Sequence, residues 1–326
     1  MFRGCGTALV TPFRRDLSLD EEALRRLVRR QIDAGIHFLV PCGTTGENPT
    51  LSRAEHLRVI EITIEEARGR VPVIGGAGGS DTRAVAALAR EVEALGADGL
   101  LTVTPPYNKP TPEGLVAHYR EIAAATRLPI VVYNVPGRTG TNVEPATLAR
   151  LARIERVVAV KEASGNLSQI ASLFVLVPES FAVLSGDDAV TLPVVALGGT
   201  GIISVVSNVV PGEMARLTAL ALEGDFGDAR ALQRRLQKLM EVMFIESNPG
   251  PVKAALGLLG LLEPAYRLPA VPPRPESLAK IEAVLAELGM LDAAAGGERR
   301  EAPATQATPA TQAAPATQAS PASIAG

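Results

Sequence analysis

Short, almost continuously apolar runs alternate with longer amphipathic stretches over residues 5–210 of the chain. The runs are rich in β-branched residues, and continuous apolarity over so few positions is typical of parallel strands buried on both faces. The pattern predicts eight strands, at residues 6–10, 37–41, 71–76, 99–103, 129–133, 157–160, 181–184 and 201–206. Each intervening stretch has room for a helix, so we expect eight successive strand–helix units.

Helix-start signals occur at the beginning of several of these stretches. Ser18 followed by Glu21 has the spacing of a capping box, and so has Ser52 followed by Glu55. A threonine precedes Pro112, which suits an N-cap followed by proline in the first turn. We therefore expect helices to begin near residues 18, 52 and 111.

Eight consecutive strand–helix units predict a closed (β/α)8 barrel of the α/β class. A doubly wound sheet uses the same units, but it usually has fewer strands and often a glycine-rich fingerprint after the first, which residues 7–12 lack. Only helical patterns occur over residues 212–292. We therefore predict a barrel over residues 1–224 and a helical region over 225–292 that packs on it.

The last part of the chain has a different composition. Pro303, Pro309, Pro315 and Pro321 recur every six residues within Pro-Ala-Thr-Gln-Ala units. Such a low-complexity tract cannot bury enough apolar surface to order itself. We predict a disordered tail over residues 293–326.

Composition excludes several classes of function. The 326 residues are 47% hydrophobic and 21% charged, with a formal net charge of -3, so we expect no nucleic-acid surface. Cys5 and Cys42 are the only cysteines and the first residues do not form a secretory signal, which predicts a cytoplasmic protein. Glycines and polar residues interrupt the most apolar stretch, 192–210, so we expect no membrane span. The three histidines match no metal-ligand spacing, and neither a metal nor another cofactor is expected.

Polar residues follow the predicted strands at the end where reactive side chains of a barrel gather. They follow the second, fourth, fifth, sixth and seventh strands, at residues 43–47, 104–108, 133–138, 161–162 and 185–188.

Lys161 is the first candidate for chemistry. It directly follows an apolar run, whereas the other four lysines lie in polar or helical surroundings where a solvated charge is comfortable. Desolvation favours a neutral amine, which is the form that attacks a ketone. The alternative is a structural lysine that forms an ion pair with Glu162 or Asp187.

Hydroxyl and guanidinium groups accompany this amine. Tyr133, Tyr107 and Thr44 lie at neighbouring strand ends and could relay protons, although Tyr133 could equally be an ordinary strand aromatic. Arg138 follows a Pro-Gly turn and could hold a carboxylate with two hydrogen bonds, or could be a solvated loop arginine. Thr45 lies in a glycine-flanked turn whose backbone amides suit an anion.

Taken together, four motifs resemble the dihydrodipicolinate synthase family, within the superfamily of pyruvate-dependent class I aldolases and N-acetylneuraminate lyases. They are residues 43–47 (GTTGE), 107–108 (YN), 133–140 (YNVPGRTG) and 161–166 (KEASGN). Each motif alone is weak to moderate, but their order on successive strands is specific. The likeness runs from Phe2 to about Leu291 and leaves out the repetitive tail.

The resemblance implies an enzyme of diaminopimelate and lysine biosynthesis. Lys161 would form a Schiff base with pyruvate, and the resulting enamine would attack the aldehyde of aspartate-4-semialdehyde. Tyr133, Thr44 and Tyr107 match the family's proton-relay triad. The Tyr107 position is donated across a tight dimer in such enzymes, which implies a homo-oligomer, and we expect a homotetramer.

The resemblance also implies how the substrates are held. Thr45 matches the position beside the pyruvate carboxylate, helped by backbone near Ile203, and Gly186 is expected in the same substrate site. Arg138 matches the residue that holds the carboxylate of the semialdehyde.

One departure from the family concerns feedback by lysine. Lysine-sensitive members carry an aromatic residue before the relay tyrosine and an Asn and a Glu on the third strand–helix unit. Here those places hold Pro106, Ser80 and Ala84, although His56 remains. We therefore expect weak or absent inhibition by lysine.

Two other functions are compatible with parts of the sequence. N-acetylneuraminate lyases and 2-keto-3-deoxy-sugar-acid aldolases share the lysine and the tyrosine but generally lack an arginine at position 138. A catalytically silent barrel would be expected to have lost the amine or the relay, and both are present in this sequence.

Overall fold

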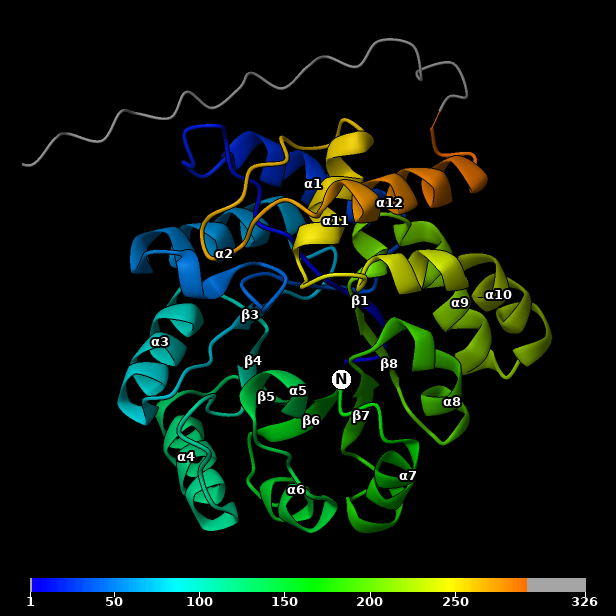
Figure 1. Cartoon of the computed structure of the whole chain (residues 1–326). Helices are drawn as coiled ribbons and strands as arrows, with labels where there is room; N and C mark the ends of the chain where they lie inside the picture. The colour runs from blue at the N-terminus through cyan, green and yellow to red at the C-terminus, as the bar shows by residue number, and fades with distance from the viewer. Residues whose placement is uncertain (1, 292–326) are drawn as a thin grey trace, which may run out of the picture. The chain divides into compact units, whose positions relative to one another are not determined.

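Eight short parallel strands form the centre of the computed structural model, which describes residues 2–291. In sequence order the strands are β1 (Gly4–Ala8), β2 (Phe38–Val40), β3 (Ile74–Gly76), β4 (Gly99–Val103), β5 (Ile130–Asn134), β6 (Val157–Glu162), β7 (Ala182–Ser185) and β8 (Gly201–Ser204). They pair in the order β2-β1-β8-β7-β6-β5-β4-β3, and a parallel bridge from Leu39 to Val73 links the two ends. The predicted eight-stranded barrel is confirmed (Figure 1). The tail predicted at 293–326 lies outside the described residues.

Helices surround the strands (Figure 1). Up to β8 they are α1 (Glu21–Asp33), α2 (Arg53–Ala67), α3 (Thr82–Ala94), α4 (Pro112–Ala125), α5 (Pro136–Thr139), α6 (Pro145–Leu151), α7 (Leu167–Leu176) and α8 (Thr191–Ala196). Single 3-10 turns occur at η1 (Asn48–Thr50), η2 (Asp188–Val190) and η3 (Val206–Asn208).

Two of the three expected helix starts are confirmed. Ser52 and Glu55 form a reciprocal capping box at the start of α2, and the Thr111 side chain caps α4. The capping box expected at Ser18 is wrong, because Asp20 caps α1 and accepts a hydrogen bond from the Ala23 amide. Asp20 directly precedes the helix and occupies the N-cap position, whereas Ser18 lies two residues earlier and donates to the Asp16 carboxylate instead.

The helices after β8 belong to the same compact unit as the barrel. They are α9 (Pro211–Glu223), α10 (Phe226–Val242), α11 (Gly250–Leu258) and α12 (Pro275–Glu287). α9 packs on β1, while α10 and α11 contact η2 and η3, so these helices lie toward the β1 and β8 side of the barrel (Figure 1). The boundary expected at residues 224–225 stays a prediction.

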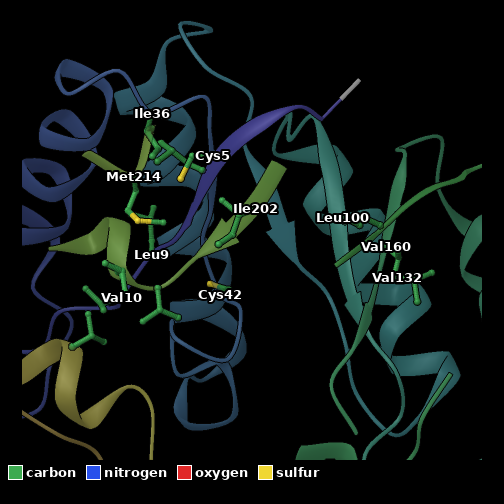
Figure 2. Packing of buried hydrophobic residues seen from close by; sticks show 14 of the residues in the cluster. Cys5, Leu9, Val10, Ile36, Cys42, Leu100, Val132, Val160, Ile202 and Met214 are labelled. Atoms are coloured by element: carbon green, nitrogen blue, oxygen red, sulfur yellow. The ribbon is translucent and has the colours of Figure 1, made fainter. Parts of the chain in front are cut away.

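Apolar side chains form two separate layers. One fills the inside of the barrel and includes Phe38, Ile74 and Leu184. The other lies between the strands and the helices, where Leu9 packs near Met214 (Figure 2). Because successive residues of a strand face opposite sides, Lys161 shares the inward face of β6 with Ala159 in the inner layer.

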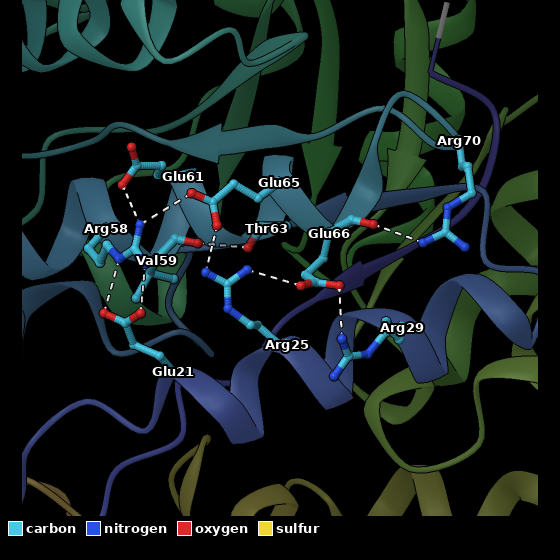
Figure 3. A network of polar contacts seen from close by, with 10 residues as sticks. All are labelled: Glu21, Arg25, Arg29, Arg58, Val59, Glu61, Thr63, Glu65, Glu66 and Arg70. Atoms are coloured by element: carbon cyan, nitrogen blue, oxygen red, sulfur yellow. Dashed lines mark hydrogen bonds and ion pairs between the residues drawn. The ribbon is translucent and has the colours of Figure 1, made fainter.

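An ion-pair network joins α1 to α2 (Figure 3). Arg25 contacts Glu65 at 2.6 Å and Glu66 at 3.0 Å, and Arg58 contacts Glu21 at 2.7 Å. Exposed pairs of this kind contribute little singly, but the linked set fixes α2 after the loop that follows β2.

Between residues 2 and 291, no helix is long and apolar enough to cross a membrane.

Candidate active site

A cavity of about 380 Å³ opens at the carboxyl ends of the strands. Five of the eight residues expected in the substrate site line it together, namely Thr45, Tyr133, Arg138, Lys161 and Gly186. Met240 and Phe244, from α10 and the residues after it, cover the same cavity, so the C-terminal helical segment completes the wall. We call this cavity the lysine chamber.

Lys161 lies inside the strand, not after it. β6 continues to Glu162, and Lys161 pairs in register with Tyr133 on β5. Its side chain is only 4% exposed, and its Nζ lies 4.3 Å from the centroid of the Tyr133 ring. Strand pairing therefore places the amine and the phenol side by side.

The Lys161 amine forms no ion pair with any residue from 2 to 291, so the structural alternative is not realised. Glu162 faces the other side of β6, where its carboxylate accepts hydrogen bonds from Asn134 Nδ2 at 2.9 Å and the Ser164 amide at 2.7 Å. The Asp187 carboxylate accepts from the Ala189 amide. The amine is consequently free to react with a molecule in the chamber.

Gly186 gives the lysine side chain its space. A Cβ at this position would lie 2.7 Å from the Ala163 Cβ and 3.1 Å from the Lys161 Cγ. The Gly186 amide also donates to the Glu162 carbonyl oxygen at 2.7 Å, which keeps the backbone against β6. A larger residue would therefore clash with Ala163 and crowd the Lys161 side chain.

The loop after β2 brings Thr45 to the chamber. Its backbone turns through bonds from the Gly46 amide to the Gly43 oxygen and from the Glu47 amide to the Thr44 oxygen, both at 3.1 Å. Asn248 donates to the Thr45 hydroxyl at 3.0 Å and lines the chamber beside it.

The expected chain of hydroxyls is not assembled within one copy of the chain. Thr44 lines two adjoining cavities of about 450 and 600 Å³ and does not line the lysine chamber. Tyr107 is 94% exposed, in a backbone conformation with a φ of 72°. Over the described residues, no hydrogen bond joins Tyr133 to either of them.

Arg138 stands where the three cavities meet. The short helix α5 presents it at the rim, and it lines the lysine chamber and both adjoining cavities. Its side chain is exposed and forms no hydrogen bond or ion pair with any residue in the range 2–291. The guanidinium is therefore available to a carboxylate that enters from this side.

Ile203 is not brought to the cavity surface. Its side chain is fully buried in the inner apolar layer of β8, and Val205 lines the chamber in its place. Both cysteines are free and buried, and burial raises the pKa of the Cys42 thiol, so a reactive thiolate is not available there.

One of the sequence expectations about lysines is wrong. Lys253 on α11 is completely buried and forms an ion pair with Glu47, although its helical setting predicted a solvated charge. Its isolation in the apolar sequence GPVKAALGL is the signal that could have identified it. Asn248, which precedes α11 and contacts Thr45, has no comparable signal in the sequence.

Asp188 is a second buried charge that sequence reasoning missed. Its carboxylate is fully buried and accepts hydrogen bonds from the Ser204 hydroxyl and from the amides of Val205 at 3.1 Å and Val206 at 3.4 Å. It thereby ties η2 to the end of β8, next to the chamber wall. Burial is the largest influence and raises the pKa of Asp188 to about 6.

This shift predicts how Asp188 affects stability. An aspartate in an unfolded chain has a pKa of about 3.9, so between pH 4 and 6 the native state keeps a proton that the unfolded state has lost. The contribution of Asp188 to the free energy of unfolding therefore falls by roughly 3 kcal/mol as the pH rises through this window. Asp188→Asn stays neutral, so its stability relative to the wild type should rise over the same range.

Urea unfolding of both proteins at a series of pH values, at one protein concentration, measures this difference directly. A difference between the two free energies that does not change with pH would show that the buried carboxyl does not titrate in this window. Other carboxylates, such as Glu55 and Glu93, have their pKa lowered to about 2 by arginine contacts, and they cancel in the comparison.

No group of three or more histidine, cysteine, aspartate or glutamate side chains within residues 2–291 is arranged to hold a metal ion. The chamber brings together an amine, a phenol and a guanidinium, and the Thr45 hydroxyl and the carboxylates of Asp187 and Glu241 also line it. That set suits the covalent activation of a carbonyl compound that also carries a carboxylate.

The chain is similar to the proteins of one known family. The model of the Dihydrodipicolinate synthetase family matches residues 1–288. The 4-hydroxy-tetrahydrodipicolinate synthase of Koribacter versatilis (strain Ellin345) is 54% identical over 290 residues, which cover 89% of this chain and 97% of that protein.

Solved structures agree. The dihydrodipicolinate synthase of Thermotoga maritima is 46% identical with a TM-score of 0.87, and the match covers 89% of this chain and all of that one. The chloride-inhibited dihydrodipicolinate synthase of Acinetobacter baumannii, solved in complex with pyruvate, is 40% identical with a TM-score of 0.88 over the same shares. This chain therefore belongs to the dihydrodipicolinate synthetase family.

Proposed function

We propose that the chain is a 4-hydroxy-tetrahydrodipicolinate synthase, which condenses pyruvate with L-aspartate-4-semialdehyde at the start of diaminopimelate and lysine biosynthesis. The observation that carries this proposal is the buried Lys161 amine, which has no ion-pair partner and lies 4.3 Å from the Tyr133 ring. Membership of the family supports the same reaction. No separate cofactor is needed, because the imine on the lysine is itself the electron sink.

The reaction begins with attack of the Lys161 amine on C2 of pyruvate. The carbinolamine loses water to form an imine, and loss of a proton from C3 gives an enamine. The enamine carbon then forms a bond to the aldehyde carbon of the second substrate, whose oxygen takes up a proton. The α-amino group of the bound product finally attacks the imine, which releases Lys161 and closes the ring.

Protons move in each of these steps. Tyr133 is the group beside the amine and carries the proton exchanged with the carbinolamine oxygen. We assign the remainder of the relay to Thr44 of the same chain and Tyr107 of a second copy.

The carboxylates define where each substrate lies. Thr45, in its amide-rich turn, and the backbone near Gly186 receive the carboxylate of pyruvate, and Val205 lines the chamber where the backbone near Ile203 was expected. Arg138, at the rim, receives the carboxylate of the semialdehyde.

Product formation tests the proposal. Pyruvate is supplied with the semialdehyde, with N-acetylmannosamine or with glyceraldehyde in parallel reactions, and the consumption of pyruvate is measured in each. With the semialdehyde, the product is also detected through the next reductase of the pathway. We expect turnover with the semialdehyde only. Turnover that prefers a sugar aldehyde would keep the Schiff base but would replace the proposed function by that of a sugar-acid aldolase.

We further propose that the protein is a homotetramer in which Tyr107 completes the site of a neighbouring copy. Two observations support this: Tyr107 projects almost fully exposed from its own chain, and a second apolar surface, at Val175, Leu176 and Leu197, lies on and after α7 and α8. Several large apolar side chains exposed close to one another are typical of association surfaces.

Subunit complementation tests the shared site. Lys161→Ala and Tyr107→Ala are each expected to be nearly inactive alone. Co-expressed chains should recover about a quarter of wild-type activity, because about half of the randomly paired dimers are mixed and half of the sites in a mixed dimer are intact. Sedimentation velocity would give the number of copies. Absence of recovery in a confirmed mixed oligomer would mean that Tyr107 acts within its own chain, and full activity of Tyr107→Ala alone would place Tyr107 outside the relay.

We also propose that lysine inhibits this enzyme weakly. The adjoining cavity of about 600 Å³ is lined by His56 and Pro106, and the nearby Ser80 hydroxyl is already bonded to the Pro106 carbonyl oxygen at 3.0 Å. Ala84 offers no carboxylate to an ammonium group. Initial rates should therefore be the same with and without millimolar L-lysine, and strong inhibition would contradict the proposal.

We place this activity in the cytoplasm, where the two free thiols stay reduced. Cell fractionation followed by the coupled assay checks it, and activity confined to an extracellular fraction would contradict it.

A further inference from the structure

The ion pair between Glu47 and Lys253 is the most buried charge pair of the described residues. The Lys253 Nζ lies 2.6 Å from Glu47 Oε1, and the two side chains are 0% and 3% exposed. The lysine amine also lies 4.4 Å from the centroid of the Phe13 ring and 5.4 Å from that of Tyr266. The pair is therefore enclosed by aromatic rings and shielded from solvent.

Stability alone does not account for this pair. Burial of two charges costs free energy that their attraction only partly offsets, and apolar residues of similar volume often serve as well. Burial accordingly raises the pKa of Glu47 and lowers that of Lys253. The second oxygen of Glu47 has no hydrogen-bond partner, so the contact is not optimised for stability.

The two residues join the two segments that hold Thr45. Glu47 ends the 43–47 loop in a left-handed conformation with a φ of 55°, two residues after Thr45. Lys253 lies in the first turn of α11, five residues after Asn248, which donates to the Thr45 hydroxyl. Two contacts thus connect the 43–47 loop to the segment that leads into α11. One is the buried ion pair, and the other is the hydrogen bond from Asn248 to Thr45 at the chamber.

We propose that Glu47 and Lys253 are a positioning pair, which anchors the 43–47 loop to α11 and so holds Thr45 at the place where it receives the carboxylate of pyruvate. This inference rests on the proposed function, because it takes Thr45 as the carboxylate site. Neither residue touches the chamber. Both act through the loop and through its contact with Asn248.

Glu47→Asp tests the Glu47–Lys253 ion pair. It keeps the carboxylate and a similar side-chain shape, but it shortens the side chain by one methylene. The readout is the pyruvate concentration that gives half-maximal trapping by borohydride, measured by intact mass without the second substrate. We expect this concentration to rise roughly three- to tenfold, as for the loss of one hydrogen bond. The extent of trapping at saturating pyruvate should stay at the wild-type level.

A double-mutant cycle with Asn248→Ala then separates positioning from a merely structural role. If both residues act by placing Thr45, the combined variant should be much less impaired than the product of the two single effects. The matched control is Glu287→Asp in the exposed pair with Lys238, which should leave the half-saturating pyruvate concentration unchanged.

Two results would overturn the inference. One is a Glu47→Asp protein that melts at a lower temperature but traps pyruvate with the wild-type half-saturation, and the other is a cycle whose effects simply multiply. Wild-type protein that forms no adduct at all would instead reject the proposed function, so the two failures are distinguishable.

Discussion

Lys161→Ala is expected to abolish the borohydride-stable adduct with pyruvate and to lower kcat/KM by roughly 10³-fold or more. The loss is large because the amine forms the covalent bond on which every later step depends. No second lysine can replace it within the described residues: Lys253 is held by Glu47, and Lys161 is the only lysine that lines the chamber.

Intact mass after reduction measures the adduct, and the wild-type chain should gain one 1-carboxyethyl group. Lys238→Ala, in an exposed pair on α10, is the matched control and should trap pyruvate normally. Circular dichroism would confirm that Lys161→Ala keeps its fold, which we expect because the residue forms no ion pair. Normal trapping by Lys161→Ala would assign the Schiff base to a different residue.

The strands are the part of this fold that the sequence predicts best, because both of their faces are buried and few other patterns give continuous apolarity. Boundaries are predicted less well. Leu9 and Val10 continue the apolar run past the end of β1. The Leu9 amide still donates to the Val40 oxygen on β2, whereas the Val10 amide donates to the Asn208 side chain, so the strand ends here although the apolar pattern continues. Similarly, β6 includes Lys161 and Glu162, whose polarity suggested that the strand had ended.

Single residues that stand out against their surroundings were also predictable. Lys161 interrupts an apolar strand, and that contrast identifies it whatever its partner is. Lys253 was misjudged because one turn of a helix offers both a solvated and a buried side, and its partner Glu47 lies 206 positions away. Sequence spacing alone does not contain such a long-range pairing.

The relay shows a different limit. The resemblance groups Tyr133, Thr44 and Tyr107 into one unit, yet a single chain keeps Tyr107 exposed and leaves the three hydroxyls unconnected. A site that is shared between copies cannot be complete in one chain. In the homotetramer that we propose, a second copy supplies Tyr107, and the complementation experiment tests whether that contact forms.

Arg138→Ala is expected to lower kcat/KM for the semialdehyde by roughly 10²- to 10³-fold, because a charge-assisted, two-pronged contact with the substrate carboxylate is lost. Half-saturation by pyruvate in the trapping experiment should change by less than about twofold, since Thr45 and not Arg138 receives that carboxylate. The guanidinium has no protein partner from residue 2 to 291, so its removal leaves no buried charge unpaired.

Arg138→Lys distinguishes charge from geometry. A lysine keeps the positive charge but lacks the planar fork, so it should recover only a part of the lost kcat/KM. Arg138 lines all three cavities, and under the proposed function the second substrate rests at this rim while pyruvate lies deeper, beside Lys161, so we expect the effect to be selective. If the substitution impaired half-saturation by pyruvate as much as kcat/KM for the semialdehyde, Arg138 would shape the whole chamber. An unchanged kcat/KM for the semialdehyde would remove its assigned role.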